Sequence, residues 1–223
     1  MKRSQIEAAI AEARAAFAAA GLRLPPFAEW GPQEWDAAGD APLVAAGCGW
    51  DVTDYGAGAF DRLGLTLFTL RNGRLADLEA GGGMVYAEKA LYLRPGQLAP
   101  MHRHFRKVED IIVRGDAPCR FELRPDAGGA PDRNRGVRAL CDGVWRETGD
   151  DGALVLHPGE SVTLTPEIWH AFEADAATVV LAEVSSVNDD VADNLFETPL
   201  PRFPAVEEDA PRRFPLVAER LAR

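Results

Sequence analysis

Short apolar runs separated by turn residues are the dominant pattern from Leu65 onward. Runs rich in Val, Leu, Ile, Phe and Thr and bounded by Gly, Pro, Asn or Asp are typical of β-strands joined by tight turns. The pattern predicts strands at residues 65–70, 85–93, 110–113, 119–124, 137–140, 153–156, 161–164 and 178–184. A succession of short strands at such regular spacing indicates an all-β sandwich or barrel.

The N-terminal stretch has a helical period instead. Apolar Ile6, Ile10 and Phe17 recur at helical spacing. Residues 4–7 have the form of a capping box, and Gly21 ends the period, so we expect an amphipathic helix between them.

The segments on either side of the strands differ in composition. Residues 27–58 are rich in Gly, Pro, Trp and Asp and predict an irregular arm that packs on the main domain. The chain after residue 188 is rich in Pro and acidic residues, with a short helix expected near residues 216–221. We therefore expect one structural domain with three parts: a helix and arm (1–58), a barrel (59–187) and a C-terminal extension (188–223).

Charge and hydropathy exclude several function classes. The net charge of -11 argues against binding to nucleic acid or to anionic lipid, because both rely on clustered Lys and Arg. The N-terminal region has charged residues where a leader needs an apolar run, and no later segment approaches the ~18 apolar residues of a membrane span. We therefore expect a cytoplasmic protein that binds a small molecule or a metal cation, without nucleic acid or membrane as a partner.

The three cysteines do not form a motif. Cys48, Cys119 and Cys141 are odd in number and far apart, without a CxxC pair. This spacing argues against a disulfide scaffold and against a thiolate zinc site. We expect packed or partly exposed thiols.

The histidines are the candidate metal ligands. His102 and His104 are two residues apart, so on a strand both imidazoles point to the same face. Glu109 begins a later apolar strand, and His170 can join them from a distant strand. Imidazoles with one carboxylate suit Mn²⁺, Fe²⁺, Zn²⁺, Co²⁺ or Ni²⁺ better than Ca²⁺. The fourth histidine, His157, precedes Pro158-Gly159 and is interpreted as a turn residue outside the metal site.

The spacing around these ligands resembles the two motifs of the cupin superfamily. The first is Gly96, five residues, His102-Arg103-His104, four residues and Glu109; the second is Pro158-Gly159-Glu160 followed by Pro166 and His170. The chain departs from the pattern at Gly115, which closes the first motif one residue early. It also has Ile168 and Ala174 where a Gly and an Asn are usual. These departures concern turn geometry more than ligation.

Longer strings resemble a narrower family. They are Gly49-Trp50-Asp51-Val52-Thr53-Asp54, Leu67-Phe68-Thr69-Leu70-Arg71-Asn72-Gly73, Glu88-Lys89, the run from His102 to Ile112, and Ser185-Ser186-Val187-Asn188-Asp189-Asp190. Together, over roughly residues 27–210, they look like the D-lyxose ketol-isomerase family of cupins. The resemblance implies a double-stranded β-helix, or jelly-roll, barrel and a homodimer. It also implies a Mn²⁺-dependent aldose-ketose isomerase that interconverts D-lyxose and D-xylulose, and also D-mannose and D-fructose.

Residues suited to proton transfer accompany the predicted metal site. An aldose-ketose isomerase removes a proton next to a carbonyl, and a metal ion can stabilise the enediolate that results. Glu183 is the candidate base, because a carboxylate in a partly dry barrel can take up a proton near neutral pH; the alternative is a salt-bridged carboxylate at the rim. Lys107 is a candidate to polarise or protonate a sugar oxygen and Lys89 to serve the same pocket, unless both are solvated surface residues.

Two further residues are candidates for binding the sugar. Trp169, next to His170, can stack on the apolar face of a sugar, although an indole beside a ligand is as often part of the packing. Asp189 lies in the Ser-Ser-Val-Asn-Asp-Asp string and, with Asp193, can order the chain over the barrel mouth or remain solvated.

Three classes of cupin compete on this sequence: a sugar isomerase, a metal-dependent dioxygenase and a non-catalytic sugar-binding protein. The fold alone does not decide among them. The proton-transfer groups Lys89, Lys107 and Glu183 favour the isomerase. An isomerase of phosphosugars stays open, because Arg103, Arg106, Lys107 and Arg114 supply cations.

Overall fold

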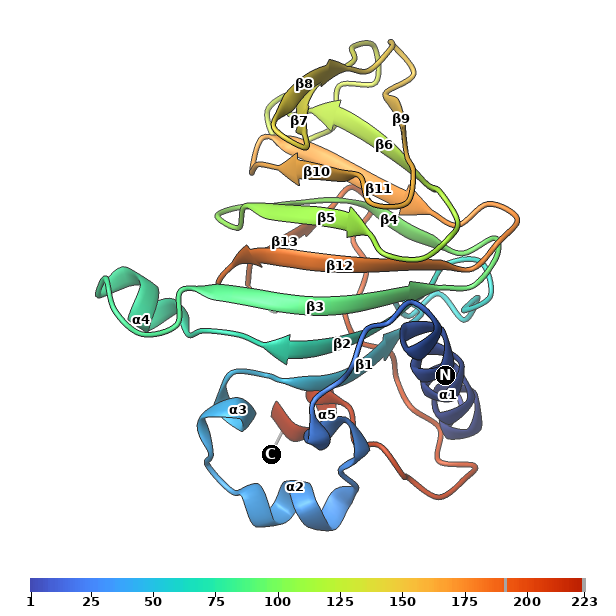
Figure 1. Cartoon of the computed structure of the whole chain (residues 1–223), viewed down its shortest axis with the longest axis vertical. Coiled ribbons are helices and arrows are strands. Elements are labelled where there is room, and N and C mark those ends of the chain that lie inside the picture. Colours follow the sequence, from blue (N-terminus) through green and yellow to red (C-terminus); the bar gives the residue numbers. More distant parts are fainter. Residues whose placement is uncertain (191, 222–223) are drawn as a thin grey trace.

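Two antiparallel sheets make up the centre of the molecule (Figure 1). The computed structural model describes residues 1–190 and 192–221. In these residues, one sheet has eight strands and the other has five. The predicted all-β barrel is therefore confirmed.

The strand order alternates between distant parts of the chain. The larger sheet has the order β1 (Gly49–Thr53), β2 (Leu65–Arg71), β3 (Tyr86–Leu93), β12 (Val179–Ser186), β5 (Glu109–Val113), β10 (Ser161–Leu164), β7 (Arg138–Cys141), β8 (Val144–Glu147). The smaller sheet has the order β13 (Asn194–Phe196), β4 (Leu98–His104), β11 (Ile168–Glu173), β6 (Cys119–Pro125), β9 (Ala153–Leu156).

The main core lies between the inner faces of the two sheets. Residues paired across antiparallel strands point to the same face, so Leu67 of β2 and Leu91 of β3 both point inward. They belong to one buried cluster with Ile111 of the larger sheet and with Phe121 and Phe172 of the smaller sheet. Towards one end of this interior, charged side chains and histidines replace the apolar ones.

The strands predicted from the apolar runs are present, with bounds shifted by one or two residues. The structure adds β1, β4, β8, β11 and β13, which the apolar runs did not reveal; strands at β4 and β11 were expected only from the positions of the histidines. β1 lies in the arm, where all five of its residues are buried, so its sequence does not alternate. The arm also contains a 3-10 helix, η1 (Pro26–Glu29), and the helices α2 (Pro32–Ala38) and α3 (Pro42–Ala45). Both flanking segments thus add strands to the barrel walls.

Helix α1 (Arg3–Ala19) covers the outer face of the larger sheet. Its buried Ile6, Ile10 and Phe17 join Trp50 of β1 and Phe68 of β2 in a second core. The amphipathic helix expected from the period is confirmed, but its predicted cap is wrong. The backbone N–H of Lys2 donates to Gln5 Oε1 at 3.0 Å.

Two short helices complete the structure. α4 (Leu75–Glu79) lies between β2 and β3 in the chain (Figure 1). α5 (Val217–Leu221) is the short helix expected near residues 216–221. No helix in residues 1–190 and 192–221 combines the length and apolar character needed to cross a membrane.

Candidate active site

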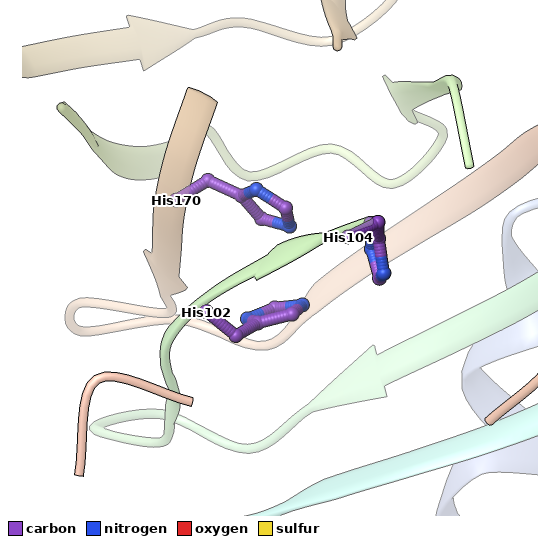
Figure 2. A group of neighbouring side chains, drawn as sticks. All are labelled: His102, His104 and His170. Carbon is purple, nitrogen blue, oxygen red and sulfur yellow. The ribbon is translucent and has the colours of Figure 1, made fainter. Parts of the chain in front are cut away.

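Three histidines converge at the polar end of the barrel interior. β4 positions His102 and His104 on one face, and β11 places His170 directly opposite His102. One ring nitrogen from each histidine lies within 4.8 Å of the others. Figure 2 shows the three rings facing a common space. The structure thus brings together histidines more than 60 residues apart, as the spacing of the two motifs required.

Glu109 approaches this cluster from the opposite sheet. Its Oε1 lies 3.2 Å from His104 Nε2 and 3.2 Å from His170 Nε2. Burial raises the pKa of Glu109, but Lys107 and His104 lower it more, so that the pKa lies well below its usual range. Glu109 is therefore ionised next to two imidazole nitrogens.

Backbone carbonyls fix the tautomer of each imidazole. The Nδ1 atoms of His102, His104 and His170 lie 2.8, 3.0 and 3.2 Å from the carbonyl oxygens of Pro100, Asp193 and Ile168. A carbonyl oxygen can only accept a hydrogen bond, so each Nδ1 carries a proton, and in a neutral ring Nε2 then presents a lone pair.

These lone pairs fit a divalent cation. Burial, with the neighbouring imidazoles, holds the pKa of His102 well below its usual range. Burial and then Lys107 lower the pKa of His104. The neutral imidazole nitrogen of His104 and the ionised carboxylate of Glu109, 3.2 Å apart, repel each other unless a cation lies between them. His170 Nε2 also finds no hydrogen-bond partner among the described residues. The donor set His102, His104, Glu109 and His170 therefore fits a transition-metal ion.

Lys107 links the cluster to Glu183. Its Nζ lies 2.6 Å from Glu109 Oε2 and 2.9 Å from Glu183 Oε1. Burial lowers the pKa of Lys107, but Glu109 and Glu183 raise it more, so the ammonium is charged. Glu183 is buried on the inner face of β12, 13 residues after His170 in the sequence.

Lys89 also contacts Glu183, at the same oxygen as Lys107. The two residues are paired across β3 and β12, and Lys89 Nζ lies 3.5 Å from Glu183 Oε1. Lys89 Nζ also donates to Asn188 Oδ1 at 2.7 Å. Of the alternatives left open by the sequence, the structure places Lys89, Lys107 and Glu183 inside the barrel, not on the surface.

The structure does not bring Trp169, Asp189 or His157 to this cavity. Trp169 points to the outer face of β11, where its Nε1 donates to Asp126 Oδ1 at 2.7 Å and its ring packs against Met101. Strand alternation explains this, because the neighbouring His170 points inward. Asp189 lies outside the cavity lining, and His157 is exposed in a turn.

Other residues that the sequence analysis did not select line the cavity. The remaining space beside the histidines is about 40 Å³. Its lining includes Tyr55, Asp190, Asn194, Phe196 and Arg202. Asp190 follows Asp189 in the same string, and no pattern favoured one over the other. Arg202 lies in a Pro-rich segment without any motif, so only the fold reveals it.

The sequence is similar to those of known proteins. A sequence profile of the family described as D-lyxose isomerase matches residues 1–220. The chain is 39% identical over 228 residues to a D-lyxose/D-mannose isomerase of Escherichia coli O157:H7, with 98% of each chain covered. It is 40% identical over 226 residues to a D-lyxose/D-mannose isomerase of Serratia proteamaculans, with 99% of this chain and 98% of the relative covered.

A solved structure shares the fold. The L-ribose isomerase of Cellulomonas parahominis, determined with no ligand, matches with a TM-score of 0.59 at 16% identity, covering 93% of this chain and 98% of that chain. The sequence matches confirm the family resemblance found from the longer strings.

Proposed function

The chain belongs to the D-lyxose isomerase family and is an aldose-ketose isomerase, and we propose that it interconverts D-lyxose with D-xylulose and D-mannose with D-fructose. The proposal includes a divalent metal cofactor, Mn²⁺ or a related ion, held by His102, His104, Glu109 and His170. The observation that carries it is the adjacency of this donor set to the buried pair Lys107 and Glu183, whose Nζ and Oε1 atoms are 2.9 Å apart.

The reaction moves two protons, and the chain supplies a group for each. A bound divalent ion would act as a Lewis acid that draws electrons from the sugar oxygens at C1 and C2 and so acidifies the proton at C2. Glu183 removes the C2 proton and returns it to C1. Lys107 donates a proton to O1 as the C1 carbonyl becomes a hydroxyl and takes one from O2 as C2 becomes the carbonyl. The net change is one C–H proton and one O–H proton moved, with no gain or loss.

The lysines also keep Glu183 in place. Lys107 and Lys89 contact the same oxygen, Oε1, at 2.9 and 3.5 Å. The other oxygen of the carboxylate is therefore left for the substrate. Burial of the pair excludes water from the proton that is being transferred.

The charges in the cavity favour a neutral sugar over a phosphosugar. Lys89, Lys107 and Arg202 each contact a carboxylate, in the pairs formed with Glu183, Glu109, Asp190 and Asp51. A phosphate dianion would have to bind next to these carboxylates. Like charges at such distances repel strongly in a buried site.

The proposal is tested by assaying ketose formation after removal of metal with EDTA. Mn²⁺, Co²⁺, Ni²⁺, Zn²⁺ and Fe²⁺ are restored one at a time, with a panel of pentoses, hexoses and their phosphates as substrates. We expect turnover of D-lyxose and D-mannose with at least one metal and none without metal. Absence of ketose from every free aldose under all metals would reject the isomerase proposal. Turnover of the phosphates alone would favour the phosphosugar alternative.

We also propose that the protein acts in the cytoplasm as a homodimer. Cys48, Cys119 and Cys141 are all free, which is typical of a reducing compartment. The exposed apolar side chains of Tyr86, Phe105 and Val108 lie near Ser186 at one end of β3 and β12, and a second copy would bury them. Light scattering should give twice the mass of a single chain, and a monomer at micromolar concentration would contradict the dimer.

A further inference from the structure

A row of alternating charges continues from Glu183 toward the edge of the larger sheet. Lys89 Nζ lies 3.5 Å from Glu183 Oε1 and 3.5 Å from Asp190 Oδ1. Arg202 Nη2 lies 3.6 Å from Asp190 Oδ2, and Arg202 Nη1 lies 2.9 Å from Asp51 Oδ2. The proton transfers described above use neither Asp190, nor Arg202, nor Asp51.

The distance from Glu183 to Asp190 and Arg202 is comparable to the length of a sugar chain. Asp190 and Arg202 line the same cavity as His102 and Glu183. Glu183 lies on β12 and Lys89 on the adjacent strand β3, and neighbouring strands are about 4.8 Å apart. From C2 to the C5 hydroxyl of an open-chain pentose, three C–C bonds and one C–O bond, of about 1.5 Å each, span roughly 5 Å. A sugar with C2 beside Glu183 therefore has its far end near Asp190 and Arg202.

Polar atoms in this row lack partners. Among the described residues, Arg202 Nη1 and Asp51 Oδ1 have no hydrogen bond. Arg202 Nη1 lies 2.9 Å from the other oxygen of Asp51, Oδ2, but this contact does not have the alignment of a hydrogen bond. Both side chains are largely buried, where polar atoms are normally paired. A buried ion pair with unused donors adds little stability, so a binding role is the better explanation.

Asp190 is able to accept a hydrogen bond at neutral pH. Burial raises its pKa, but Lys89 and Arg202 lower the pKa more, so the carboxyl is ionised. A sugar hydroxyl both donates and accepts a hydrogen bond. A guanidinium N–H and a carboxylate oxygen side by side satisfy both of its roles.

We propose that Arg202 and Asp190 bind the C5 hydroxyl of the sugar and that Asp51 is a positioning residue that holds Arg202. This inference rests on the proposed function, because it places C1 and C2 at the opposite end of the cavity. It makes the segment after β12 part of the substrate site and assigns specificity for the far end of the sugar to residues outside the cupin motifs.

The test compares D-lyxose with 5-deoxy-D-lyxose in the metal-loaded enzyme. We expect the wild type to prefer D-lyxose by about 10- to 100-fold in kcat/KM, since hydrogen bonds to charged groups have this effect. Arg202→Met should lower kcat/KM for D-lyxose and bring the ratio of the two sugars to within about threefold of one. Arg202→Lys should restore part of the ratio. Asp190→Asn provides a second variant should Arg202→Met fail to fold.

The readouts separate binding from a structural role. Arg124→Met is the matched control, because Arg124 is a buried arginine paired with Glu122 outside the cavity, and it should keep the wild-type ratio. Asp51→Asn should lower the ratio chiefly through KM. An unchanged ratio in Arg202→Met and Asp190→Asn, or a wild type that turns over both sugars equally, would overturn the inference while leaving the isomerase proposal intact. A wild type inactive on every aldose would instead reject the proposed function.

Discussion

Asp193 fixes the turn that follows His104. Its Oδ1 accepts the backbone N–H groups of Phe105 and Arg106 at 3.0 and 2.9 Å, and its Oδ2 accepts that of Lys107 at 2.9 Å. Its own carbonyl accepts from His104 Nδ1 at 3.0 Å. One residue of the C-terminal extension therefore orients both a proposed metal ligand and the proposed proton donor.

Replacement of Asp193 should weaken metal binding, although Asp193 is not one of the proposed metal ligands. In Asp193→Asn the amide nitrogen must face at least one of the three N–H groups, of which that of Lys107 is buried, and this costs about 1–3 kcal/mol of folding free energy. Metal affinity should fall about 10-fold or more, as is usual when an outer partner of a ligand is lost. Urea unfolding and metal titration measure the two effects. Asp132→Asn, which alters a carboxylate bound to a single loop N–H of Asn134, is the control; equal effects in both variants would contradict the role of Asp193.

Glu183 should be needed for turnover but not for metal binding. Glu183→Gln keeps the shape of the side chain and removes the base, so kcat should fall about 100-fold or more. Metal content, measured by mass spectrometry of the purified protein, should stay at the wild-type level. His104→Ala is the comparison, because it should lose metal and activity together. An active Glu183→Gln enzyme would remove this residue from the mechanism.

At the scale of elements, ion pairs and a backbone hydrogen bond connect the C-terminal segment to the start of helix α1. The fully buried guanidinium of Arg3 contacts Glu208, with Nη2 2.9 Å from Oε1, and also contacts Glu219. The backbone N–H of Arg3 donates to the carbonyl of Glu207 at 2.8 Å. The first turn of the first helix and the end of the chain are thus joined across the outer face of the sheet.

This junction should loosen in acid. Hydrogen bonds from Arg3 and Arg212 lower the pKa of Glu208 from 4.5 to about 2. A carboxyl with a depressed pKa stabilises the fold fully above pH 4.5 and loses that contribution as the pH falls toward 2. The difference in unfolding free energy between wild type and Glu208→Gln should therefore be constant above pH 5 and shrink below pH 4.5. Urea unfolding at several pH values measures it.

The magnitude of this effect should be modest, because Glu208 is 45% exposed and water screens the pair. Glu207→Gln is the matched control, because the Glu207 carboxylate forms no ion pair among the residues that the structure describes. A pH-independent difference for Glu208→Gln would show that the ion pair does not contribute.

At the scale of the whole molecule, the proposed metal site joins the two sheets. His102, His104 and His170 belong to the smaller sheet, and Glu109 belongs to the larger one. An ion held by all four would bind only the closed barrel, so the proposed metal binding would be coupled to folding.

Metal should therefore raise the melting temperature. At free Mn²⁺ about 100 times Kd, the native state gains about 2.7 kcal/mol. For a chain of this size, that corresponds to a rise in Tm of roughly 5–10 °C. Calorimetry of the EDTA-treated protein with and without Mn²⁺ measures the shift, and His104→Ala should abolish it. A metal-independent Tm in the wild type would speak against the four-ligand site.

The sequence was informative wherever one face of a strand or helix is buried against a single layer. The two-residue spacing placed His102 and His104 on one face of β4, and the helical period located α1, because both depend only on local geometry. The longer strings, among them Ser185-Ser186-Val187-Asn188-Asp189-Asp190, indicated the family that the sequence matches confirm. For Glu183 the sequence left a base inside the barrel and a salt-bridged rim carboxylate open, and the structure shows a carboxylate that is buried and also paired with lysines.

Only the closed barrel decided the remaining contacts. Whether Trp169 or His170 faces the interior depends on the register of β11 against β4. Glu183 pairs with Lys89 and Lys107, which are more than 70 residues away in the sequence. Arg202, which contacts Asp51 and Asp190, lies in a segment without any periodic pattern. A local period fixes the face on which a side chain lies, whereas its partner depends on how distant strands align when the barrel closes.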